Sequence, residues 1–290
     1  MLVFFKVQTM WHNSRHMKKA LFLAAGLLCF GVIAHADDYG FLDLRHRAFR
    51  SLMADPRELQ LSLRAILPVS HKLFGEVAAG DYYSLYTAPL NNSGAFFQWG
   101  MGGGIWSRFD LVSEQKDLQV TDYNASMPVD FHVGRWSTRI LPFHLSSHLG
   151  DDYIKRTGVV PEKYSFDAIK LLQAFEPTPQ WRLYGGYLYT IRWGHTDLGR
   201  HALQSGLEWT SLPWDHGSIE TFWAADLQNW ERVHWNPELH TQLGLRFRHD
   251  PDSHQTFSMY LEFATGHREQ GQFFDQQETH WGLGIKLGLW

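Results

Sequence analysis

Two histidines, two serines and two aspartates lie close together in the segment FHLSSHLGDDY, residues 143–153. His144 and Ser146 are two residues apart, so on a β-strand both side chains point to the same face. A histidine can act as general base for a serine nucleophile, and a carboxylate behind the histidine completes such a site. The segment is therefore either a candidate for acyl-transfer chemistry or the polar side of an ordinary strand.

Metal and cofactor chemistry is not indicated by the spacing of these residues. His144 and His148 would share one side of a helix, but on a strand they stand about 13 Å apart, too far to hold one metal ion. The sequence has no HExxH motif and no cysteine cluster. The glycine-rich stretch at residues 100–106 lacks the GK[ST] end of a phosphate-binding loop. We expect no metal site and no cofactor.

Strands rather than helices must position these side chains. Aromatic residues make up 15 % of the 290 residues and charged residues only 19 %, a composition rich in strand formers. The formal net charge of −4 excludes the basic footprint of a nucleic-acid-binding protein. The class expected is therefore all-β, without a nucleic-acid partner.

The N-terminal region has the order of parts found in an export signal. Residues 17–19 include two lysines, an apolar run follows at residues 20–34, and the small-x-small sequence AHA ends at Ala36. The run is shorter than the ~20 residues that a spanning helix needs. We predict a leader and signal peptide at residues 1–36, cleaved after Ala36. Cys29 lies within it, so the mature chain has no cysteine.

Apolar and polar residues alternate with period two through most of the remaining chain. In LHTQLGLRF, Leu239, Leu243 and Phe247 share one face, whereas His240 and Gln242 share the other. Recurrence of this pattern in segments of about ten residues is typical of transmembrane β-barrels. We predict an antiparallel up-and-down barrel over residues 58–290 for an outer-membrane protein. Its twelve strands are expected at 58–67, 73–86, 95–108, 119–133, 135–149, 163–176, 180–193, 201–211, 217–230, 237–249, 255–266 and 279–290.

The connections support this arrangement, because short turns such as EPTPQ and HDPDSH alternate with longer polar loops. Short connections are expected on the periplasmic side and long loops outside. Residues 37–57 are predicted as a periplasmic N-terminal segment with a short helix that Pro56 ends. We expect it to pack at the barrel rim; the alternative is a plug inside the lumen. Its apolar side would consist of Phe41, Leu44, Phe49, Leu52 and Met53.

Several stretches together resemble a bacterial exported protein family of unknown function. They are LMADPRELQLSLR at residues 52–64, GDYYSLY at 80–86, TDY at 121–123, HLSSHLGDDY at 144–153 and LYGGYLY at 183–189. The resemblance implies an outer-membrane barrel and supplies no catalytic residues. The terminal Trp290 is similar to the signal read by the barrel assembly machinery. That machinery and outer-membrane lipids are therefore the expected partners, in a Gram-negative cell.

The orientation of residues 135–149 decides what the opening segment does. Leu141, Phe143 and Leu145 form an apolar row, which we expect to meet lipid. His144, Ser146 and His148 would then face the lumen. We predict that these three residues, Asp151, Asp152 and Asp167 form a polar network there. The lumen should also hold Glu208, Glu220, Asp226, Glu262, Arg246, Arg248 and Lys286, which stand opposite apolar residues.

Two functions follow from these expectations. The favoured one is a non-enzymatic barrel with a narrow lumen that binds or passes small solutes, or that serves as an envelope scaffold, because twelve strands leave an interior largely filled by side chains. The alternative is an outer-membrane lipid hydrolase of the phospholipase or lipid A deacylase type, with His144, Ser146 and Asp167 as candidate catalytic residues. Such enzymes present a His-x-Ser pair toward lipid, which is the opposite of the predicted orientation.

Overall fold

The computed structural model describes residue 40 and residues 47–91, 93–194, 198–214, 218–248 and 255–289. The predicted signal peptide at residues 1–36 and the terminal Trp290 lie outside the described residues. No helix in the described ranges is long and apolar enough to cross a membrane.

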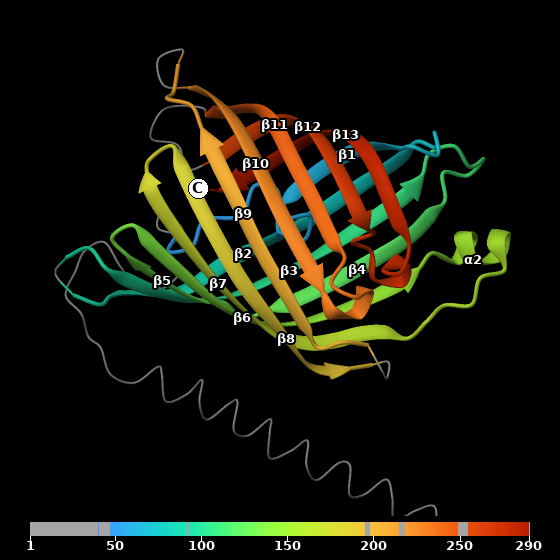
Figure 1. Cartoon of the computed structure of the whole chain (residues 1–290), viewed down its shortest axis with the longest axis horizontal. Coiled ribbons are helices and arrows are strands. Elements are labelled where there is room, and N and C mark those ends of the chain that lie inside the picture. Colours follow the sequence, from blue (N-terminus) through green and yellow to red (C-terminus); the bar gives the residue numbers. More distant parts are fainter. Residues whose placement is uncertain are drawn as a thin grey trace, which may run out of the picture. The chain divides into compact units, whose positions relative to one another are not determined.

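The described chain forms an antiparallel β-sheet that closes into a barrel (Figure 1). Strands that follow one another in the chain pair with one another, except β4 and β5, and β13 pairs with β1 to close the sheet. Closure lets the backbone N–H and C=O groups bond within the sheet, as a membrane-spanning structure requires. The strands are β1 (Leu61–Pro68), β2 (Phe74–Pro89), β3 (Phe96–Asp110), β4 (Leu118–Ser126), β5 (Val129–Val133), β6 (Trp136–Leu149), β7 (Tyr164–Thr178), β8 (Trp181–Trp193), β9 (His201–Thr210), β10 (Ile219–Trp230), β11 (Pro237–Arg248), β12 (Gln255–His267) and β13 (Gln277–Leu289).

Strands β4 and β5 are two parts of one barrel strand. Both pair with β3 on one side and with β6 on the other. The interruption falls at Met127 and Pro128, where the proline has no N–H to give to the ladder. Met127 N–H still donates to Pro142 O at 3.0 Å, which keeps the strand against β6. The barrel therefore has twelve strands, and the predicted fold class and strand number are confirmed.

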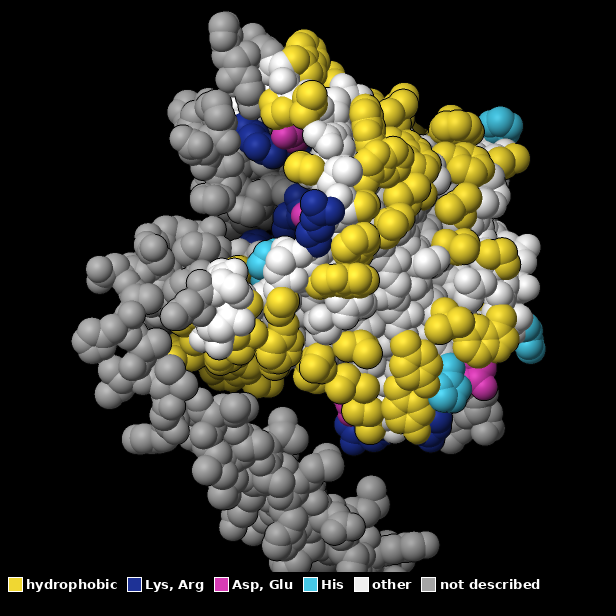
Figure 2. All heavy atoms as spheres, turned by 60° about the vertical axis from the view of Figure 1, so that its left-hand side comes forward, with side chains coloured by type: hydrophobic (Ala, Val, Ile, Leu, Met, Phe, Trp, Pro, Cys, Tyr) yellow, Lys and Arg dark blue, Asp and Glu magenta, His cyan; other side chains and the backbone are white. Residues whose placement is uncertain are grey.

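Side chains alternate between the barrel interior and its outer surface. On β10, Glu220, Phe222 and Asp226 are buried inside. On β13, Trp281 and Leu283 are 62 % and 58 % exposed on the outside. Figure 2 shows hydrophobic side chains gathered over the outer surface, as contact with lipid requires. The predicted lumen residues Glu208, Glu220, Asp226, Glu262, Arg246 and Lys286 are all buried, and Arg248 is partly buried with an ion pair to Glu220.

Residues 47–60, which we call the plug, pass through the barrel interior. Met53 N–H donates to Glu208 on β9 at 2.7 Å, and Met53 O accepts from Lys286 on β13 at 2.8 Å. Arg182 on β8 donates to the backbone oxygen of Arg50 at 2.9 Å. Because these partners come from different sides of the barrel, the segment lies in the lumen. The predicted position at the rim is therefore wrong.

Apolar side chains of the plug pack against the inner wall instead of forming one side of a helix. Phe49 and Leu52 are fully buried with Leu172 and Tyr184. No helix occurs within residues 47–60, so the helix predicted there is wrong for the described part. Irregular backbone is accommodated because the inward polar side chains of the barrel bond its N–H and C=O groups.

The two ends of the barrel differ in their connections. Three connections carry short helical turns: α2 (Asp151–Thr157) after β6, η1 (Glu231–Val233) after β10, and η2 (Gly271–Phe273) after β12. All three follow strands that run in the same direction, so they lie at one end, which we call the loop end. The other, with connections such as that between β7 and β8, is the turn end.

Glu58 links the stability of the plug to pH. Its carboxylate is 4 % exposed, and its Oε1 lies 3.7 Å from Nη1 of Arg139. Burial raises the pKa of Glu58 to about 7, and the attraction of Arg139 only partly opposes this. The folded state thus keeps a proton that the unfolded chain releases near its ordinary pKa of 4.5. Stability is expected to fall as pH rises from that value through about 7.

Replacing Glu58 by glutamine is expected to reduce this dependence of stability on pH, because the amide has no proton to release. Urea unfolding in lipid vesicles, followed by tryptophan fluorescence between about pH 5 and about pH 8, measures the slope. The exposed loop residue Glu114, replaced by glutamine, is the control and should keep the wild-type slope. An unchanged slope in Glu58→Gln would show that Glu58 is not the titrating group.

Candidate active site

Strand β6 presents His144, Ser146 and His148 on the outer face of the barrel. His144 and His148 are exposed, and Ser146 is half-buried. The residues that alternate with them along β6 point inward and are buried or partly buried. They include Arg139, Leu141, Phe143, Leu145 and Ser147. The predicted lumen position of His144, Ser146 and His148 is therefore wrong, and the polar row faces the lipid side.

The inner wall next to β6 is apolar, which explains why the orientation was predicted wrongly. Leu145 packs inside with Tyr164, Phe166 and Leu188, and Phe143 adjoins the same cluster. An apolar row that meets other apolar side chains in the lumen looks, in sequence, like a row that meets lipid. Arg139 was the contrary signal, because it belongs to that row and an arginine facing lipid is costly.

On the outer face, His144 contacts a carboxylate from the neighbouring strand. His144 on β6 and Asp167 on β7 are opposite one another in the register. Nδ1 of His144 lies 2.7 Å from Oδ1 of Asp167. A carboxylate only accepts hydrogen bonds, so Nδ1 carries the proton and donates it. The second ring nitrogen, Nε2, is then the one that can accept a proton.

Arg192 on β8 fixes the position of Asp167 from the other side. Its Nε donates to Oδ2 of Asp167 at 2.9 Å, and its Nη2 lies 2.7 Å from the same oxygen. At this point the register of β7 and β8 shifts, because β8 has one extra residue between the partners of Asp167 and Ala168. The carboxylate is thus held between a guanidinium and an imidazole, one on each oxygen.

Ser146 completes an outer-face triad with His144 and Asp167. It stands two residues from His144 on the same face, with Cα atoms about 6.6 Å apart at the rise of a strand. Between these two described residues no hydrogen bond is formed. Rotation of the serine and histidine side chains can close this separation, and catalytic hydrogen bonds are often long before substrate binds. The arrangement can therefore support attack by a serine hydroxyl with a histidine as base.

The triad lies toward the loop end of its strands. Asp167 is near the start of β7 and Arg192 is the last residue but one of β8. Farther along β7, toward the turn end, the outward residues Ile169 and Leu171 are 38 % and 48 % exposed. The polar group therefore borders the apolar outer surface, a place where water and lipid headgroups meet hydrocarbon.

Comparison with known families identifies the chain. The model of the family described as protein of unknown function (DUF1207) matches residues 36–289. The chain belongs to this DUF1207 family. The predicted resemblance to a family of unknown function is confirmed to this extent. A search of curated proteins gave no match for the DUF1207 chain.

Solved structures similar to the DUF1207 chain are outer-membrane barrels. Outer membrane phospholipase A from Escherichia coli is 14 % identical with a TM-score of 0.53, over 79 % of this chain and 92 % of that one. The phospholipase dimer with bound calcium from Salmonella typhi is 15 % identical with a TM-score of 0.53, over 81 % and 94 %. The KdgM porin is 8 % identical with a TM-score of 0.45, over 80 % and 99 %. At these identities the likeness to the two phospholipase structures shows the fold alone.

Asp151 and Asp152 of the DUF1207 chain do not join a lumen network. Both lie exposed in α2, and Asp152 forms an ion pair with Lys155 at 3.4 Å. His148 contacts the ring of Tyr123 on the outside, with ring centroids 5.8 Å apart. The predicted lumen network of the opening segment is therefore wrong. Among the described residues, no group of three or more His, Asp and Glu side chains could hold a metal ion.

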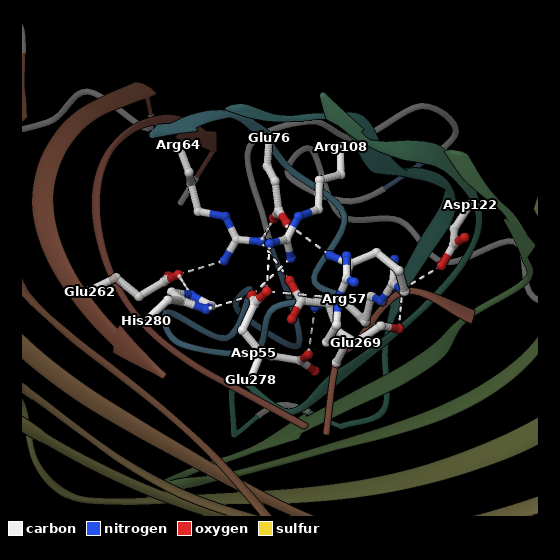
Figure 3. Close-up of polar contacts among 12 residues, drawn as sticks. Asp55, Arg57, Arg64, Glu76, Arg108, Asp122, Glu262, Glu269, Glu278 and His280 are labelled. Atoms are coloured by element: carbon white, nitrogen blue, oxygen red, sulfur yellow. Dashed lines mark hydrogen bonds and ion pairs between the residues drawn. The ribbon is translucent and has the colours of Figure 1, made fainter. Parts of the chain in front are cut away.

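The lumen of the DUF1207 chain holds a different polar network (Figure 3). Arg64 on β1 contacts Glu262 at 2.7 Å and Glu269 at 2.9 Å, and it also pairs with Glu76. Arg108 on β3 contacts Glu278 at 2.7 Å. Alternation predicted Glu262 in the lumen but missed Glu269, because Glu269 belongs to the connection between β12 and β13.

That connection folds into the loop end of the barrel. Gly271 N–H donates to Asp122 at 3.0 Å, and Gln272 N–H donates to the Ser147 hydroxyl at 3.0 Å. Burial would raise the pKa of Glu269, but the Arg64 guanidinium holds that pKa well below its usual range. The plug and this connection together occupy much of the lumen, and they support β6 directly behind the outer-face triad.

Proposed function

We propose that the DUF1207 chain is an outer-membrane hydrolase of acyl esters in membrane lipids. The observation that carries the proposal is the 2.7 Å contact between His144 and Asp167 on the lipid side of the barrel, with Ser146 on the same face. A water-filled lumen would explain a polar row as simple solvation. A row that faces outward beside an apolar surface needs another explanation, and a site for lipid substrates supplies one.

In this mechanism Asp167 orients the imidazole of His144 and stabilises its charged form. His144 Nε2 takes the proton of Ser146 as the serine oxygen bonds to the ester carbonyl carbon. The ester C–O bond then breaks, and the imidazolium gives its proton to the leaving alcohol. Water, deprotonated by His144, releases the acid from the acyl-serine and restores the hydroxyl. Arg192 keeps Asp167 in place throughout.

The location of the substrate follows from the position of the triad at the loop end. We assign the loop end to the cell exterior, because long loops of such barrels lie outside. The substrate would then be a lipid of the outer leaflet, with its ester groups at the level of the triad. Export through a signal peptide cleaved after Ala36, followed by insertion by the barrel assembly machinery, is part of the same proposal.

Passage of solutes through the lumen is less well supported. The plug and the connection between β12 and β13 occupy much of the interior, and buried hydrogen bonds and ion pairs hold both in place. A scaffold role is compatible with the filled lumen but leaves the outward triad without a purpose.

Covalent labelling of the serine tests the proposal. The full-length protein, purified in mixed micelles of detergent and phospholipid, is expected to release fatty acid and to react with a fluorophosphonate at Ser146, as mass spectrometry of the peptide would show. Ser165 stands opposite Ser146 on the outer face of β7, so Ser165→Ala is the matched control and should still be labelled. If the folded protein neither hydrolyses lipid nor reacts with the fluorophosphonate, the hydrolase proposal is wrong and the scaffold function remains.

A further inference from the structure

A cavity of about 310 Å³ opens at the turn end of the barrel, away from the outer-face triad. Its lining comes from the plug and from the turn-end parts of β1, β11, β12 and β13, including Leu61, Arg246, Ser258 and Lys286. At about 30 Å³ for each water-sized group, this volume accommodates a ligand of about ten non-hydrogen atoms. The space is therefore suited to a small solute rather than to a polymer.

Two cationic side chains, Lys286 and Arg246, line this turn-end cavity. Lys286 Nζ donates to Met53 O at 2.8 Å and to Gln242 Oε1 at 2.7 Å, both uncharged acceptors. Within the described residues it has no carboxylate at ion-pair distance. Arg246 shares its carboxylate partner, Glu220, with Arg248.

The acid among the described lining residues does not pair with Lys286. Asp81 lines the cavity, but its carboxylate is paired with Arg47 at 2.8 Å. The wall therefore holds a buried cation, Lys286, whose hydrogen-bond acceptors among the described residues are uncharged. Such a wall attracts an anion more strongly than an exposed lysine does.

The rest of the lining combines apolar and hydroxyl groups. Met53 and Leu59 supply buried apolar surface, and Ser258 lies near the cations. The alkyl chain of a ligand can contact the apolar side chains, and its carboxylate can accept hydrogen bonds from Ser258 and the cationic side chains. An inorganic anion would leave the apolar part of the cavity unused.

We propose that the turn-end cavity binds a small amphiphilic anion, a carboxylate with a short alkyl chain whose charge is held by Lys286 and Arg246. This site is separate from the proposed lipid hydrolysis and does not depend on it. It would make the barrel a receptor for solutes on the side opposite the triad, which we assign to the periplasm.

The test uses hexanoate labelled with ¹³C in its carboxyl group and the full-length protein in lipid nanodiscs. Wild-type protein is expected to shift the carboxyl resonance saturably, beyond the effect of empty nanodiscs. Lys286→Met is expected to weaken binding at least tenfold. Lys155→Met on α2, which removes an exposed lysine, is the matched control and should bind as the wild type does. Hexanamide, which has the shape without the charge, should not bind.

A second variant guards against a folding defect in Lys286→Met. Ser51 of the plug lines the cavity, so Ser51→Phe fills it without changing any charge. Heat-dependent gel mobility checks that each variant forms the barrel. The proposal is supported if both folded variants lose hexanoate binding. Binding that survives in folded Lys286→Met or Ser51→Phe, or hexanamide binding equal to that of hexanoate, would overturn it.

Discussion

Replacing Ser146 by alanine is expected to lower the rate of lipid-ester hydrolysis by on the order of 1,000-fold or more, with the barrel intact. The alanine has no hydroxyl to form the acyl intermediate, and His144 has no nucleophile to activate. Ser146 is half-buried on the outer face, and its hydroxyl forms no hydrogen bond with the described residues, so the loss of this hydroxyl should barely change stability. Fatty-acid release from phospholipid in mixed micelles measures the rate, and heat-dependent gel mobility measures folding.

Two further variants separate catalysis from a general effect on the surface. In Asp167→Asn the amide can turn either its oxygen or its NH2 group toward Nδ1 of His144. The tautomer with the proton on Nδ1 is then no longer enforced, and the rate of hydrolysis should fall by a large factor. Ser165→Ala removes the neighbouring outward hydroxyl on β7 and should leave the rate unchanged. Hydrolysis at the wild-type rate in Ser146→Ala would show that this serine is not the nucleophile.

Strand positions followed from the sequence because a membrane barrel restricts the pattern so strongly. The strand predicted at 135–149 is β6 at Trp136–Leu149, and the strand predicted at 201–211 is β9 at His201–Thr210. Every backbone polar group must bond within the sheet, and lipid accepts few polar side chains. Period-two alternation in the sequence then predicts the strands directly. It also placed Glu262 and Lys286 correctly in the interior.

The orientation of β6 could not be obtained from that alternation alone. Its two faces are both mixed, because Leu141 and Leu145 share a row with Arg139 and Ser147. Deciding between them requires knowing that Phe166 and Leu188, from other strands, form an apolar patch inside the barrel. That is tertiary information, and it changes the assignment of the opening segment from lumen to lipid face.

The plug shows the same limit for the N-terminal segment. Phe49 and Leu52 can be buried equally well at a rim or in a lumen, so their apolar character does not distinguish the two. The distinction is made by Glu208 and Lys286, which bond the backbone of Met53 from positions far along the chain. Such pairings leave no local pattern in the sequence.

The other large effect is expected from Arg64→Met in the lumen. The Arg64 side chain is 9 % exposed and contacts Glu262 at 2.7 Å and Glu269 at 2.9 Å, in addition to Glu76 (Figure 3). Its removal leaves several buried carboxylates with less compensating charge. Breaking a buried ion pair in this way costs about 3–5 kcal/mol, because the remaining charge keeps its desolvation penalty. The free energy of unfolding from urea titration in lipid vesicles should fall by that amount near neutral pH.

The pH dependence of this loss identifies its cause. Although burial favours a high value, Arg64 holds the pKa of Glu269 well below its usual range. Without Arg64, Glu269 binds a proton more readily as pH falls, so the loss should be largest above neutral pH and shrink toward acid. Lys155→Met is the matched control, because Lys155 is 75 % exposed and pairs with Asp152, which is 58 % exposed, and exposed ion pairs contribute little. If Arg64→Met were no more destabilising than Lys155→Met, or equally destabilising at acid and alkaline pH, the buried network would not depend on Arg64 in this way.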